Sequence, residues 1–146
     1  MKHGKLILTA SLLAGAMVLF GWSRPTPAAR VVECSCADVQ VAGRWTGTGV
    51  DTDGTGWTFT LELKQRRCRL SGSFRWRSAD GHSGTELVRG TVDCKRRLKV
   101  RGHQLKNVKG ALTTTRYRGV FSKNLRTVKG RWLDGVPGTF KGRKAK

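Results

Sequence analysis

The chain has 146 residues, which suits one domain, and it carries 29 Lys and Arg against 9 Asp and Glu, a formal net charge of +20. Because so few acidic groups cannot neutralise that excess, we expect the molecule to attract an anionic polymer or an anionic lipid surface, without reading a base sequence. The acidic residues and histidines form no nucleophile-plus-base arrangement and no metal-ligand spacing. These features favour a binding protein over an enzyme, with no cofactor and no metal.

Residues 1–29 have the pattern of a signal peptide. Lys2 and Lys5 precede an uncharged apolar run over residues 6–22, and small residues suited to cleavage follow near Ala28 and Ala29. We therefore expect a secreted or periplasmic protein. The alternative is a membrane anchor through residues 6–22, although that run is short for a bilayer-spanning helix.

Residues 30–42 form a short leader that contains Cys34 and Cys36, and the remainder of the chain, 43–146, is the expected folded domain. Export leads to an oxidising compartment, where an even number of cysteines usually indicates disulfides.

Apolar and polar residues alternate from Gly43 onward, which is the pattern of strands with one buried and one solvated face. Turn residues such as those in Asp51–Gly56, Ala79–Gly81 and Asp134–Gly135 separate the alternating runs. Eight strands are expected, over residues 43–50, 56–64, 68–77, 84–93, 96–103, 115–122, 127–133 and 138–143. Short strands joined by tight turns indicate an all-β fold, and a single antiparallel up-and-down β-barrel of about eight strands is favoured over a sandwich because it leaves no exposed edge.

A repeated signature, in which an apolar residue, a polar or basic residue and then Gly follow one another, supports the barrel. Its glycines are Gly47, Gly72, Gly90, Gly102, Gly119, Gly130 and Gly142. Each shares the phase of the apolar residues, so it should point inward. There it would permit tight coiling and make room for large aromatic neighbours.

Two hairpins can be tested for face consistency. Centring the third and fourth strands on Gly81 sets Phe74 opposite Val88 and Cys68 opposite Cys94, which predicts a Cys68–Cys94 disulfide. That pairing leaves Cys34 and Cys36 to bridge each other or another chain.

The sixth and seventh strands pass the same test. Their predicted register pairs Phe121 with Val128 and Tyr117 with Trp132 on the inward face, because a slip of one residue would put these aromatics in water.

The first strand opens with Gly43-Arg44-Trp45, and in this the chain resembles the calycin group of lipocalin-like and avidin-like barrels. In lipocalin-like barrels the tryptophan of this motif packs across one end of the barrel, near a basic residue of the last strand. The resemblance implies that Arg131 or Arg143 has this role here. It further implies a bias towards binding, but no particular ligand.

Basic residues with the outward phase are the main functional signal, and they lead to the first hypothesis: an exported protein that contacts an anionic polymer or envelope lipid through the barrel exterior. The candidate anion-binding residues are Arg75, Arg77, Arg89, Lys99, Arg101, Arg118, Lys129 and Arg131.

The second hypothesis is a calycin-like carrier of a small hydrophobic ligand in the barrel interior. Its candidate lining residues are Trp45, Trp57, Phe59, Phe74, Trp76, Glu86, Tyr117 and Trp132. The alternative is that these side chains simply fill the core, because an eight-stranded barrel can be just wide enough for them. A third hypothesis is a structural or inhibitory envelope protein that acts through a protein partner of unknown identity.

Overall fold

A computed structural model describes residues 35–146, and the predicted signal segment over residues 1–29 lies outside them. After a short 3-10 helix, η1 (Cys36–Asp38), eight strands follow one another in chain order. They are β1 (Gly43–Asp51), β2 (Gly56–Arg66), β3 (Arg69–Ser78), β4 (Ser83–Val92), β5 (Arg97–Lys109), β6 (Arg116–Phe121), β7 (Thr127–Trp132) and β8 (Gly138–Lys144). No helix among these described residues is long and apolar enough to cross a membrane.

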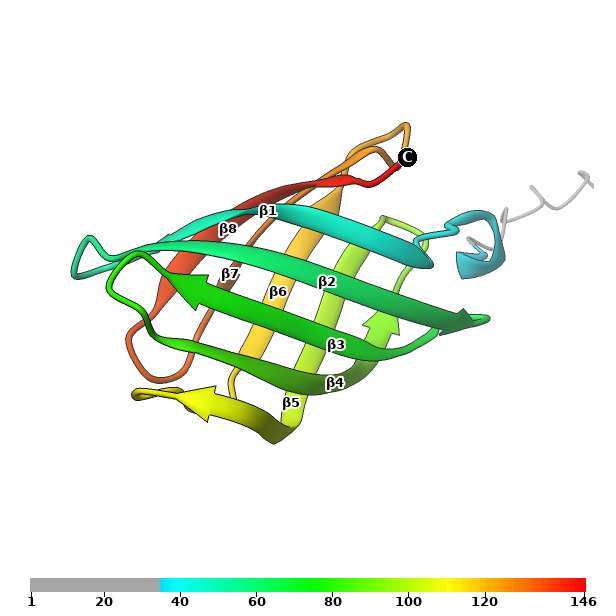
Figure 1. Ribbon diagram of the computed structural model, residues 1–146. Helices are drawn as coiled ribbons and strands as arrows, with labels where there is room; N and C mark the ends of the chain where they lie inside the picture. The colour runs from blue at the N-terminus through cyan, green and yellow to red at the C-terminus, as the bar shows by residue number, and fades with distance from the viewer. Residues whose placement is uncertain (1–34) are drawn as a thin grey trace, which may run out of the picture. The chain divides into compact units, whose positions relative to one another are not determined.

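Each strand pairs antiparallel with the next, and β8 pairs with β1, so the sheet closes into an up-and-down barrel (Figure 1). The predicted fold class is therefore confirmed. Closure gives every strand a hydrogen-bonded neighbour on both sides, which removes the exposed edge of an open sheet.

The inward glycines are required by close approach of neighbouring backbone and rings. A Cβ atom on Gly72 would lie 1.8 Å from the carbonyl oxygen of Glu62, and one on Gly90 would lie 1.9 Å from that of Lys99. A Cβ atom on Gly130 would lie 2.5 Å from the ring of Phe140. These contacts confirm that glycine permits the tight coiling of this small barrel and makes room for its aromatic core.

The register of the β6–β7 hairpin is the predicted one, with Tyr117 opposite Trp132 and Phe121 opposite Val128. The predicted register of β3 and β4 is wrong by two residues, because Phe74 lies opposite Glu86. The turn is centred on Asp80, and Gly81 follows with a φ of +93°. This is the geometry of a three-residue hairpin loop that ends in a left-handed glycine.

The two-residue shift also makes the predicted Cys68–Cys94 disulfide wrong. The backbone carbonyl of Cys68 accepts a hydrogen bond from Val92, and its sulfur is bonded to Cys36, with the two Cα atoms 5.4 Å apart. Cys94 is disulfide-bonded as well, but not to Cys68. A disulfide is consistent with the oxidising compartment expected for an exported protein.

Residues 35–42, the described part of the leader, close one end of the barrel. Val39 and Val41 are buried there, and the side chain of Gln65 accepts a hydrogen bond from Val41 N and donates one to Val39 O, each 2.8 Å long. Together with the Cys36–Cys68 bridge, these contacts hold the leader beside the β2–β3 turn. We call this the capped end.

Trp45 lies fully buried at the capped end, with its ring 4.9 Å from that of Phe121. The basic group near it is Lys144 of β8, whose Nζ lies 5.6 Å from the ring centroid. The expectation that Arg131 or Arg143 has this role is wrong, because both side chains are exposed on the outer face. The last strand does supply the basic group, as the resemblance implies.

Candidate functional site at the open end

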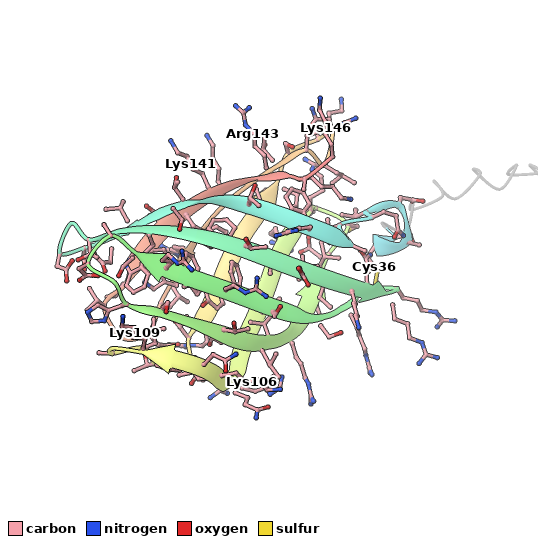
Figure 2. The ribbon with its side chains drawn as sticks, in the orientation of Figure 1. Cys36, Lys106, Lys109, Lys141, Arg143 and Lys146 are labelled. Atoms are coloured by element: carbon pink, nitrogen blue, oxygen red, sulfur yellow. A yellow bond between two sulfur atoms is a disulfide. The ribbon has the colours of Figure 1, made fainter. Side chains whose placement is uncertain are left out.

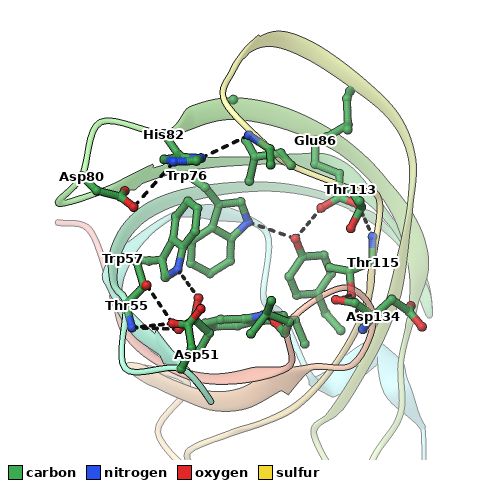
Figure 3. A pocket seen from close by; sticks show the side chains of 18 residues that line it. Asp51, Thr55, Trp57, Trp76, Asp80, His82, Glu86, Thr113, Thr115 and Asp134 are labelled. Carbon is green, nitrogen blue, oxygen red and sulfur yellow. Dashed lines mark hydrogen bonds and ion pairs between the residues drawn. The ribbon is translucent and has the colours of Figure 1, made fainter.

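The other end of the barrel is surrounded by the β1–β2, β3–β4, β5–β6 and β7–β8 turns and contains a cavity of about 260 Å³. We call this the mouth (Figure 3). Its lining residues are Asp51, Asp53, Thr55, Trp57, Trp76, Asp80, His82, Gly84, Glu86, Leu105, Ala111, Leu112, Thr113, Thr115, Tyr117, Trp132, Asp134 and Val136. They are spread along the chain from Asp51 to Val136, and closure of the barrel brings them together.

A layer of stacked rings forms the floor of the mouth. The ring centroid of Phe74 lies 4.3 Å from that of Tyr117 and 5.1 Å from that of Trp76, with the planes nearly parallel. Phe59 and Phe140 pack edge-on against Phe74 from below. Aromatic side chains thus fill the middle of the barrel, and the cavity lies above them.

The indole groups of the mouth donate their hydrogen bonds to the protein itself. Trp57 Nε1 donates to Asp51 Oδ2 at 3.0 Å, and Trp132 Nε1 donates to Val136 O at 2.6 Å. Trp76 Nε1 donates to the Tyr117 hydroxyl at 2.9 Å. These bonds fix the ring planes, because a buried indole N–H without a partner is costly.

Glu86 ends this chain of hydrogen bonds inside the barrel. Its side chain is 2% exposed, and it accepts hydrogen bonds from Thr115 N at 2.7 Å and from the Tyr117 hydroxyl. Burial raises the pKa of Glu86, and the two hydrogen bonds oppose that shift. Burial, reinforced by the neighbouring Glu86 carboxylate, raises the pKa of Tyr117 well above its usual value. Tyr117 therefore acts as a neutral donor to Glu86.

Acidic side chains from three turns surround the opening. Asp51 and Asp53 accept from Thr55 N at 2.8 and 2.9 Å, and Asp80 accepts from the hydroxyl of Ser78. Asp134 is bound by Arg116, whose Nη2 lies 2.6 Å from Oδ1, and these hydrogen bonds hold the pKa of Asp134 at about 2. Within the part of the chain that the structure describes, Asp134 is the one acidic residue of the mouth that forms an ion pair with Lys or Arg.

The structure separates the predicted interior residues into two groups. Trp57, Trp76, Glu86, Tyr117 and Trp132 line the mouth. The others, Trp45, Phe59 and Phe74, are core residues below the cavity or at the capped end.

All eight predicted anion-binding residues are exposed on the outer face. Six of them lie on neighbouring strands β4 to β7 and, with Lys141 of β8, form a continuous surface that we call the cationic face: Arg89, Lys99, Arg101, Arg118, Lys129, Arg131 and Lys141. Direct cross-strand neighbours include Arg89 with Arg101, Lys99 with Arg118, Arg118 with Arg131, and Lys129 with Lys141. Figure 2 shows Lys141 projecting away from the barrel.

Two predicted anion-binding residues lie apart from this surface. Arg75 and Arg77 of β3 pair with threonines of β2 and with Thr85 and Ser83 of β4.

Four of the acidic residues of the mouth lie in turns that the sequence predicts: Asp51, Asp53, Asp80 and Asp134. Asp51 and Asp80 do stabilise their turns, and Asp134 accepts a hydrogen bond from Arg116 N at the start of β6. All three also line a common opening. A signal was available, because alternate turns of an up-and-down barrel lie at the same end, and these acidic residues occur in alternate turns.

The fold and the site together define a class of protein: a closed, eight-stranded up-and-down β-barrel with one capped end and an aromatic cavity at the other. No known protein family and no curated protein matches the chain.

Similar solved structures are small redesigned or de novo designed barrels. A redesigned β-barrel, mFAP0, bound to DFHBI, has a TM-score of 0.56 and 18% identity over 71% of this chain and 98% of its own. A second redesigned barrel, mFAP1, also bound to DFHBI, has a TM-score of 0.59 and 16% identity over 76% and 100%. A fluorescence-activating β-barrel of de novo design has a TM-score of 0.51 and 19% identity over 75% and 98%. At these identities the likeness establishes the fold alone.

Proposed function

We propose that the protein binds a small aromatic ligand in the mouth of its barrel, as a carrier or binding protein and not as an enzyme. The observation that carries this proposal is the cavity lined by the aromatic side chains of Trp57, Trp76, Tyr117 and Trp132. Ligand sites are typically concave and apolar, with a few polar groups that fix orientation. Two of the similar barrels are described as bound to the small molecule DFHBI, which supports the proposal.

The size of the cavity limits the ligand. At about 260 Å³ it is smaller than the roughly 300–1,000 Å³ of drug-sized ligand sites. Because the ring layer of Phe74, Trp76 and Tyr117 closes the floor, a ligand cannot pass deeper into the barrel. A single or fused planar ring, partly exposed at the opening, fits these limits.

Tryptophan N–H signals provide a direct test. Titration with benzamide, a neutral one-ring probe, should shift the indole signals of Trp57 and Trp76 in nuclear magnetic resonance spectra and leave that of Trp45 unchanged, because Trp45 lies at the capped end. Trp57→Ala removes a wall and should weaken binding. Val120→Ala, on the exposed outer face, is the control and should not. Equal shifts at all three indoles would contradict the proposal.

A second candidate function is binding of an anionic polymer or anionic lipid surface by the cationic face. The observation that favours it is that like charges lie directly opposite each other on neighbouring strands, which destabilises the barrel unless counterions or a polyanion neutralise them. Ligand uptake at the mouth and attachment through the outer face are compatible, because they use different surfaces. An exported protein in a cell envelope would meet such polymers.

A further inference from the structure

We propose that the mouth selects a small aromatic cation, such as a planar ring carrying a protonated amine or amidinium group. This inference rests on the proposed function, because it names the chemical class of ligand for the same cavity. Three observations support it: the charge of the lining, the direction of its hydrogen bonds, and the tryptophan rings in its walls.

The charge of the mouth is opposite to that of the rest of the molecule. The chain has 29 Lys and Arg residues, yet none of them is among the described residues that line the cavity. Five carboxylates do line it: Asp51, Asp53, Asp80, Glu86 and Asp134. Because a narrow opening with low-dielectric walls concentrates the field of its charges, a cation is attracted there and an anion is repelled.

Most of that negative charge is not neutralised within the described residues. Asp134 is paired with Arg116, and Asp80 lies 3.6 Å from Nε2 of His82. By contrast, the hydrogen-bond donors to Asp51 and Glu86 are an indole, a phenol and backbone amides, which are neutral. None of these donors carries a positive charge, so a cationic ligand would supply the missing partner.

The hydrogen bonds of the lining leave acceptors for a ligand and few donors. The N–H groups of Trp57, Trp76 and Trp132 and the hydroxyl of Tyr117 all donate to protein acceptors. Nδ1 of His82 accepts from Ala111 N at 3.1 Å, so its remaining N–H is directed towards Asp80. A ligand that brings its own N–H donors finds oxygen acceptors, whereas a carboxylate ligand would lack donors.

Trp57, which is partly buried, and the buried Trp76 and Trp132 all line the cavity with their rings. Trp57 and Trp76 lie edge to face with centroids 6.4 Å apart, and Trp76 and Trp132 lie 5.3 Å apart. Tryptophan faces attract cations more strongly than other aromatic faces do. Acidic oxygens at the rim and indole faces in the walls form a binding site for an organic cation (Figure 3).

The test compares three probes that share one ring and the same number of heavy atoms: benzamidinium, benzamide and benzoate. Isothermal titration calorimetry at neutral pH and low salt measures the affinity of the protein for each probe. We expect the affinity for benzamidinium to be about tenfold above that for benzamide, and the affinity for benzoate to be the weakest. Benzamide or benzoate binding as tightly as benzamidinium would overturn the cation proposal and leave the proposed function standing. No shift of the Trp57 and Trp76 indole signals with any probe would overturn both.

A rim variant separates the charge from the cavity. Asp53→Asn with Asp80→Asn keeps an oxygen for the hydrogen bonds from Thr55 and Ser78 and removes two exposed charges. This variant should lose benzamidinium affinity several-fold and keep its benzamide affinity. Asp38→Asn, an exposed change in η1 at the capped end, is the control and should alter neither. An unchanged benzamidinium affinity in the rim variant would contradict the role of the carboxylates.

Discussion

Glu86 fits inside the barrel because Gly102, on the neighbouring strand β5, has no side chain. A Cβ atom on Gly102 of β5 would lie 1.4 Å from Oε1 of Glu86 and 2.3 Å from its carboxyl carbon. The sequence predicted an inward phase for both residues, but not that one makes room for the other. The periodicity of the sequence predicts which face of the sheet a side chain lies on. Which other residues that side chain contacts depends on how the barrel closes.

Gly102→Ala should therefore destabilise the protein. The added methyl group would displace Glu86 from Thr115 N and the Tyr117 hydroxyl, at a cost of about 1–3 kcal/mol in the free energy of unfolding for buried groups left unsatisfied. Urea denaturation measures this loss. Gly56→Ala is a matched control, because a Cβ atom there meets nothing within 4 Å. Equal destabilisation by the two substitutions would contradict the proposed packing.

The Asp134–Arg116 pair predicts a dependence of stability on pH. Hydrogen bonds from Arg116 lower the pKa of Asp134 from 3.8 to about 2. The unfolded chain therefore binds more protons than the folded one in this interval, and the pair's contribution is complete above about pH 4 and is lost as pH falls towards 2.

Melting temperatures of the wild type and Asp134→Asn, compared across this range, test the prediction. The wild type should be the more stable protein at neutral pH, and the difference should shrink as pH falls through the interval. A difference that stays constant would show that the carboxylate's charge does not contribute.

At the scale of the elements, alternation predicted all eight strands and the face of each. It predicted the β6–β7 register correctly because a one-residue slip would expose Tyr117 or Trp132. It failed for β3–β4 because a two-residue slip keeps every side chain on its own face, so the apolar pattern cannot detect it. The loop geometry at Asp80 and Gly81 decided that register, and the cysteine pairing followed from it.

The leader is an element whose role the sequence did not reveal. Cys36→Ser with Cys68→Ser should lower the free energy of unfolding by about 3–4 kcal/mol, because the bridge closes a loop over a sequence separation of 32 residues. Chemical denaturation measures the loss. Peptide mapping under non-reducing conditions provides the check on connectivity: the fragment with Cys68 should remain linked to the fragment with Cys36. A direct link between the fragments with Cys68 and Cys94 would contradict the structure.

The sequence predicted the inward strand residues of the mouth but not its complete lining, because four turns also contribute and the segment around 104–114 shows little alternation. The structure extends β5 through Lys109, with irregular pairing to β4 near Val88 and near Ser83. These irregularities bend the strand and carry Leu105 and the following turn to the opening.

At the scale of the whole molecule, charge is segregated. The outer wall over β4 to β8 is basic, whereas the lining of the mouth is acidic. Composition predicted the first part, because basic residues so outnumber acidic ones. The second part depends on where the few carboxylates gather, and net charge contains no information about that.

Retention on heparin tests the cationic face. The triple variant Lys99→Gln, Arg118→Gln, Arg131→Gln removes a row of three facing charges. Its elution should move to lower salt, and the slope of log K against log salt should fall by about 2–3.

The control is a second triple variant, Arg44→Gln, Lys64→Gln, Arg66→Gln, which removes the same charge from exposed positions on β1 and β2. It should shift elution less. Equal shifts would mean that net charge alone, and not this surface, determines retention.

The pairing of β5 allows the barrel to open more easily at the mouth than at the capped end. β5 pairs with β6 over Arg97–Arg101, and Gly102 N donates one further hydrogen bond to Thr115 O. Beyond Gly102, the outer part of β5, up to Lys109, pairs with β4. The pairing between β5 and β6 is therefore complete near the capped end of the barrel and ends before the mouth. Local opening of this outer part can widen the mouth while the paired strands near the capped end stay closed. Exchange of a ligand between the cavity and the solvent therefore does not require unfolding of the barrel.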